Sequence, residues 1–116
     1  EKTSEENVEL QSARSMTYNG VWINAGHAAT GSFTIQNPHT IINKTNGTFK
    51  VESEYSNATA QFILHDGIKE LANETVKASD GDVHFEFKSN IQNLSVTYFV
   101  TRTSPSKGMR LNCWLW

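Results

Sequence analysis

The sequence contains one cysteine and two prolines among its 116 residues, and no apolar run approaches the length of a membrane-spanning helix. With Cys113 alone, no disulfide can form within the chain, so the disulfide framework of many small extracellular domains is excluded. The net charge is only -2, from 10 basic and 12 acidic residues. This balance excludes the basic footprint of a nucleic-acid-binding protein and a polybasic mode of membrane binding.

What the chain does contain is enough apolar bulk for one core. Hydrophobic residues make up 37% of it, and six phenylalanines, three tyrosines and three tryptophans contribute large side chains. A chain of this length forms one domain and leaves no room for a second with its own core. Residues 1–7 are mostly charged and lack large apolar side chains, so we expect a disordered leader there and a single domain over 8–116.

Alternation of apolar and polar residues dominates the second half of the chain and predicts strands with one buried face. The predicted strands cover 8–13, 16–24, 31–36, 48–55, 59–65, 68–71, 74–78, 82–89, 94–102 and 108–116. Turn signals punctuate them at Asn19-Gly20, Asn46-Gly47, Asp66-Gly67, Asp80-Gly81 and Ser106-Lys107-Gly108.

Many short strands with regular turns predict an all-β fold, an antiparallel β-sandwich of the jelly-roll or immunoglobulin-like type. The Cys-Trp-Cys signature of immunoglobulin domains is missing, which favours a jelly-roll or another sandwich topology. Residues 68–79 leave two alternatives open, a hairpin or one short helix, because Ile68, Leu71, Ala72 and Val76 also share a helical face.

The sequence shows no triad, metal motif or phosphate-binding loop, so we expect a protein that is not an enzyme and has no cofactor. Cys113 alternates with leucines and is expected to be a buried apolar residue. His84 and Glu86 share an outward strand face that His65 could join, but solvated histidines are the favoured interpretation. Asp80 and Asp82 offer carboxylates to a structural calcium ion, although a plain hairpin turn explains them equally well.

The C-terminal segment 108–116 is the most informative. Alternation there places Arg110, Asn112, Trp114 and Trp116 on one face, opposite a core face. A hairpin of 94–102 with 108–116 would bring Phe99 near Trp114. The predicted ligand-binding residues are Trp114, Trp116, Phe99, Arg110, Asn112 and Trp22, with rings to stack on a sugar and polar groups to bind its hydroxyls.

These features favour a secreted or cell-surface, non-catalytic binding module for a glycan. The strand pattern is similar to the general plan of secreted β-sandwich modules, including carbohydrate-binding modules. Five N-x-[ST] sequons, at Asn43, Asn46, Asn57, Asn73 and Asn93, also lean towards an exported protein. The alternative is a small toxin-like or protein-interaction factor whose aromatic edge meets a surface protein, a membrane or a second copy through the C-terminal strand. A third possibility is a structural domain with buried tryptophans.

Overall fold

The computed structural model describes residues 3–10, 16–24, 28–35, 45–88, 94–102 and 107–116. These form nine strands and one short 3-10 helix. The elements are β1 (Thr3–Leu10), β2 (Met16–Ile23), β3 (Thr30–Thr34), β4 (Asn46–Ser53), β5 (Thr59–His65), β6 (Glu70–Lys77), η1 (Ala78–Asp80), β7 (Val83–Glu86), β8 (Ser95–Arg102) and β9 (Met109–Leu115). The predicted all-β class is confirmed.

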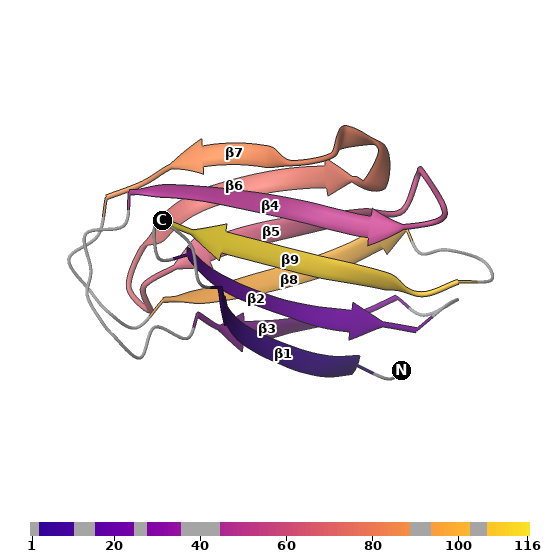
Figure 1. Ribbon diagram of the computed structural model, residues 1–116, viewed down its shortest axis with the longest axis horizontal. Helices are drawn as coiled ribbons and strands as arrows, with labels where there is room; N and C mark the ends of the chain where they lie inside the picture. The colour runs from indigo at the N-terminus through magenta and orange to yellow at the C-terminus, as the bar shows by residue number, and fades with distance from the viewer. Residues whose placement is uncertain (1–2, 11–15, 25–27, 36–44, 89–93, 103–106) are drawn as a thin grey trace.

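The strands form two antiparallel sheets that lie face to face (Figure 1). The five-stranded sheet has the order β1-β2-β9-β4-β7, and the four-stranded sheet has the order β3-β8-β5-β6. Strand β9 is central, since its backbone pairs with β2 on one side and with β4 on the other. A second chain therefore cannot extend the sheet at β9, and any contact through this strand has to use its side chains.

The inner faces of both sheets supply one continuous core. Its largest fully buried side chains include Phe33, Phe49 and Phe62. Phe49 stacks on Phe62 of the opposite sheet, with ring centroids 4.7 Å apart, and on Phe85 of the neighbouring strand at 4.4 Å. This stack joins the two layers, and the apolar faces predicted by alternation are the ones that are buried.

The N-terminal segment differs from the expectation. A disordered leader was expected over 1–7, whereas β1 begins at Thr3, so the structure describes most of this segment as an edge strand. Its register runs from Thr3 opposite Ile23 to Leu10 opposite Met16. An edge strand is held by backbone hydrogen bonds to one neighbour, so it does not need the large apolar side chains that the sequence argument required.

The structure of residues 68–79 is neither the hairpin nor the helix that the sequence left open. A single strand, β6, covers most of this segment and pairs along its length with β5, and only Ala78–Asp80 is helical. The helix is therefore wrong, and so is a hairpin within the segment, whose chain reversal lies earlier, at 66–69. Val76 is fully buried beside Ala60, which shows that tertiary burial on one strand face outweighs the helix propensity of the segment.

The turn between β5 and β6 depends on one carboxylate. Asp66 accepts hydrogen bonds from the backbone N–H groups of Lys69 at 2.8 Å and Ile68 at 2.9 Å, and Gly67 provides the positive φ of 92°. These bonds, that of Lys69 foremost, lower the pKa of Asp66 below its ordinary value. The predicted turn at Asp66-Gly67 is confirmed.

Because the folded-state pKa of Asp66 lies below its unfolded value, its contribution to stability is complete above the ordinary aspartate pKa of about 4 and is lost as the pH falls below that value. We therefore expect Asp66→Asn, which keeps an acceptor oxygen but no charge, to be less stable than the wild type at pH 7. The gap between the two proteins should narrow between about pH 4 and pH 2. Urea unfolding at several pH values measures this, and a gap that stays constant down to pH 2 would contradict it.

Candidate functional site

The outer side of the five-stranded sheet, which we call the aromatic face, carries tryptophans among polar and charged residues. On β9 and just after it, the outward positions are those that alternate with core residues. The neighbouring strands add residues in register with them. Among the residues whose side chains the structure describes, the face comprises Trp22, Asn46, Thr48, Lys50, Glu52, Asp82, His84, Glu86, Arg110, Asn112, Trp114 and Trp116.

Trp114 and Trp116 lie together at one end of this face. Both are half-buried on the outer side of the sheet. The Trp116 backbone continues the ladder, since its N–H donates to Asn46 O at 3.0 Å. The His84 ring lies 5.6 Å from the Trp116 ring, at an interplanar angle of 37°. The structure thus adds His84, from a strand not adjacent to β9, to the predicted aromatic pair.

A hollow of about 320 Å³ adjoins this end of the face. Its lining among the described residues is Thr45, Glu86, Phe87 and Lys88. Thr45 donates its N–H to the Trp116 carbonyl at 3.1 Å, and its carbonyl accepts from Phe87 N at 2.9 Å. Backbone hydrogen bonds between three neighbouring chain segments therefore connect the hollow to Trp116.

Asn112 occupies the middle of the face but has no exposed surface. Its Nδ2 donates a hydrogen bond to Oε1 of Glu52, which is exposed. Asn112, predicted to bind ligand, therefore has no surface that a ligand could contact in this arrangement. The exposed polar group at this position is the carboxylate of Glu52, which lies on another strand and was not among the predicted residues, and the hydrogen bond from Asn112 restricts its orientation.

Arg110 is half-buried and stands between Trp22 and Glu52, its Cα partners on the two neighbouring strands. In the next row, Lys50 forms an ion pair with Asp82, with Nζ 3.8 Å from Oδ1. Opposite charges therefore alternate across the face, and they can donate to and accept from the hydroxyl groups of a ligand.

Trp22 lies at the far end of the face from Trp116. Its ring lies over Gly108, where a Cβ atom would be 2.1 Å from Trp22 Cζ2, and its Nε1 donates to Asn24 Oδ1 at 3.2 Å. Since Trp22 pairs with Arg110 and not with Trp114, the predicted set is split. Trp114 and Trp116 are brought together, and Trp22 is separated from them by the row of Asn112.

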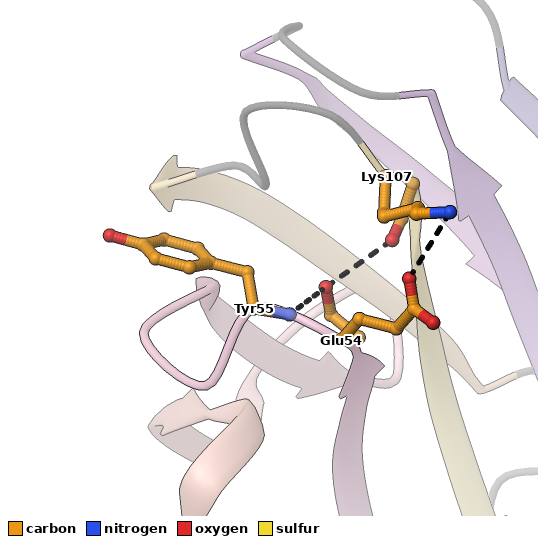
Figure 2. Close-up of polar contacts among 5 residues, drawn as sticks. Glu54, Tyr55 and Lys107 are labelled. Atoms are coloured by element: carbon orange, nitrogen blue, oxygen red, sulfur yellow. Dashed lines mark hydrogen bonds and ion pairs between the residues drawn. The ribbon is translucent and has the colours of Figure 1, made fainter.

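Contacts between the ends of β4 and β9 support this far end (Figure 2). The Ser53 hydroxyl donates to Gly108 O at 3.3 Å and accepts from Tyr55 N at 3.2 Å. Lys107 Nζ lies 3.5 Å from Glu54 Oε2, an exposed ion pair of little energetic weight. Figure 2 shows the Tyr55 ring directed away from this pair. The contacts fix Gly108 beneath the Trp22 ring.

Phe99 lies elsewhere in the molecule. β8 pairs with β3 and β5 in the four-stranded sheet, whereas β9 belongs to the five-stranded sheet. The predicted hairpin of 94–102 with 108–116 is therefore wrong, and Phe99 faces outward on the opposite side of the sandwich from Trp114. Strands adjacent in sequence here cross between sheets instead of pairing, which strand periodicity does not reveal.

The histidines and carboxylates considered as metal ligands either lie in different sheets or form hydrogen bonds and ion pairs within the protein. His65 is on β5 of the four-stranded sheet, so it does not join His84 and Glu86, and its Nε2 lies 2.9 Å from Thr97 Oγ1. Asp80 accepts from Lys77 N at 2.8 Å, and Asp82 pairs with Lys50. The described part of the chain contains no group of three or more His, Cys, Asp or Glu residues placed to hold a metal ion.

Cys113 is buried, as alternation predicts. Burial raises the pKa of its thiol far above the ordinary value, so the thiol remains protonated and unreactive in the folded state.

No family model matches the chain, and no curated protein or solved structure is significantly similar to it. Among the described residues, none belongs to a helix with the length and apolar character needed to cross a membrane.

Proposed function

We propose that this protein is a non-catalytic module that binds a glycan on its aromatic face. The observation that carries the proposal is the cluster of Trp114, Trp116 and His84 beside the hollow lined by Glu86. A half-buried indole ring has little conformational freedom to lose, and its exposed part can contact the apolar face of a sugar ring. Small-ligand sites combine such apolar surface with a few fixed polar groups.

The aromatic face also has polar groups that can form hydrogen bonds with the hydroxyl groups of a sugar. Sugar hydroxyls both donate and accept hydrogen bonds, and the face offers the donor Arg110 and the acceptor Glu52 in one row. The bond from buried Asn112 restricts Glu52, so less conformational entropy is lost when the carboxylate accepts from a ligand.

We also infer that the sandwich is a jelly roll. The support is the strand pairing, in which β2 lies beside β9, β3 beside β8, β4 beside β7, and β5 beside β6. This is the order obtained when one long antiparallel hairpin, with its tip between β5 and β6, is wound into two sheets. Jelly rolls are a common scaffold of sugar-binding proteins, which agrees with the proposed function as an analogy of fold.

A location outside the cell or at its surface is part of the same proposal. Asn57 and Asn73, two of the five sequon asparagines, are exposed in the structure, whereas Asn46 is half-buried. Exposed sequons are compatible with passage through a glycosylating compartment.

The test is a Trp114→Ala variant measured against a panel of soluble polysaccharides by tryptophan emission and calorimetric titration. We expect affinity to fall by about tenfold or more, because the stacking surface is lost. Trp114→Phe is the matched control, since it keeps a ring and should retain most of the affinity.

Unchanged affinity in Trp114→Ala, with an unchanged melting temperature, would contradict the proposal. Self-association or liposome binding that depends on Trp114, without glycan binding, would instead favour the protein-interaction or toxin-like alternative.

A further inference from the structure

The outer side of the four-stranded sheet, which we call the hydroxyl face, is built almost entirely from uncharged polar residues. Three adjacent strands present threonine, serine, glutamine and histidine side chains in register, and β6 adds asparagine and threonine. Its described members are Thr30, Ser32, Thr34, Thr59, Gln61, Ile63, His65, Asn73, Thr75, Ser95, Thr97, Phe99 and Thr101. Among them, none carries a permanent charge; the rows of this face end on β6 at two charged residues of opposite sign, Lys77 beside Thr59 and Glu70 beside His65.

Phe99 stands in the middle of this face. Its exposed fraction is 37%, unusually high for a phenylalanine on a central strand, and its Cα partners are Thr30 on one side and Gln61 on the other. Thr75 completes the row beyond Gln61. One ring is thus surrounded by hydroxyl and amide groups, the surroundings that an aromatic residue needs to stack on a sugar while its neighbours bind the hydroxyls.

The polar side chains around Phe99 are already ordered. Gln61 Nε2 donates to Asn73 Oδ1 at 2.9 Å, and His65 Nε2 lies 2.9 Å from Thr97 Oγ1. Side chains held in this way lose less conformational entropy when a ligand binds than mobile ones do.

We propose that the hydroxyl face is a second binding surface, specific for an uncharged polysaccharide. The charge pattern decides the ligand class. A nucleic acid or an acidic polymer needs several cationic side chains, whereas the described charged residues of this face are one acidic and one basic, Glu70 and Lys77, at the two ends of edge strand β6. A neutral chain carries no charge to be desolvated on this surface and can exchange hydrogen bonds across it. This surface is separate from the aromatic face, and neither requires the other.

The experiment uses the full chain in native gels containing mixed-linkage β-glucan, arabinoxylan or galactomannan, with polygalacturonate as the acidic comparison. Phe99→Thr removes the ring but keeps a side chain suited to a strand. We expect this substitution to lower the affinity for at least one neutral polymer by about tenfold, measured from how strongly the polymer slows the migration of the protein in the gel. Phe99→Tyr should restore it. Ile68→Thr is the matched control, because it removes an apolar side chain that is 87% exposed in the β5–β6 turn, away from the face.

Tryptophan emission separates this surface from the aromatic face. All three tryptophans lie in β2 or in and directly after β9, so a ligand on β8 leaves their emission unchanged. Binding that Phe99→Thr weakens should therefore persist in Trp114→Ala and should be insensitive to added salt. The proposal is overturned if none of the neutral polymers retards the wild type, if Phe99→Thr behaves as Ile68→Thr does, or if polygalacturonate binds best in a salt-sensitive manner. If Phe99→Thr behaves as Ile68→Thr does while Trp114→Ala loses the retardation, the hydroxyl face is overturned and the aromatic face is supported, so the failure of one surface is distinguished from the failure of the other.

Discussion

Replacing Phe49 by alanine is expected to destabilise the protein by about 3–5 kcal/mol, enough to unfold a domain of ordinary stability. Phe49 has no exposed surface, and its ring stacks on rings from the opposite sheet and from the neighbouring strand. Truncation therefore removes contacts within and between the layers and leaves a cavity that rigid strands close poorly. Denaturant unfolding monitored by tryptophan emission measures the loss.

Phe99→Ala is the matched control for this experiment, because it deletes the same atoms from a partly exposed position. Surface substitutions of this kind change stability by about 0.5 kcal/mol or less. Equal losses in Phe49→Ala and Phe99→Ala would mean that Phe49 does not link the two sheets as described.

The core could be predicted from the sequence, because burial follows alternation within each strand. Phe85 and Phe87 on one predicted strand, and Val96 and Tyr98 on another, are buried as the period of two requires. Phe99, between the inward-facing positions, is on the outer side. This information is local, so it is available without knowing which strands are neighbours.

The candidate sites could be predicted only in part, since they depend on strand order. Trp114 and Trp116 share a face because they lie on one strand, which the sequence shows directly. The contact of Trp116 with His84 and the hydrogen bond from Asn112 to Glu52 require β4 to lie beside β9 and β7 to lie beside β4, and nothing in the periodicity specifies those neighbours. Phe99 was predicted to lie near Trp114 because strand order was unknown; β8 and β9 are in fact in different sheets.

Strand order also determines what the two outer faces can do. The central position of β9 exposes its tryptophans to the side chains of two neighbouring strands, so the aromatic face combines rings with paired charges. The central position of β8 places Phe99 among threonines and amides instead. Because the faces point in opposite directions, two ligands bound to them would not compete. The proposed ligand classes of the two surfaces follow from these different surroundings.

Gly47 shows that a glycine in the sequence can indicate either a turn or a closely packed strand position. Asn46-Gly47 was predicted as a turn, but both residues lie in β4, and the prediction is wrong. A glycine is needed there because the Phe85 ring lies against its backbone: a Cβ atom at Gly47 would be 2.2 Å from Phe85 Cζ. The absence of a side chain thus serves close packing and not a chain reversal.

Gly47→Ala is therefore expected to destabilise the protein by about 1–3 kcal/mol, because Phe85 must leave its place against Phe49 to make room. Replacing the Phe85 ring by the smaller side chain of leucine should relieve the clash with the Cβ atom introduced by Gly47→Ala. In the double variant Gly47→Ala/Phe85→Leu, we expect the loss to be smaller than the sum of the two single losses, by about 0.5–3 kcal/mol. Urea unfolding of the four proteins measures this coupling. Additive losses would show that the cost of Gly47→Ala comes from the β4 backbone and not from the Phe85 ring.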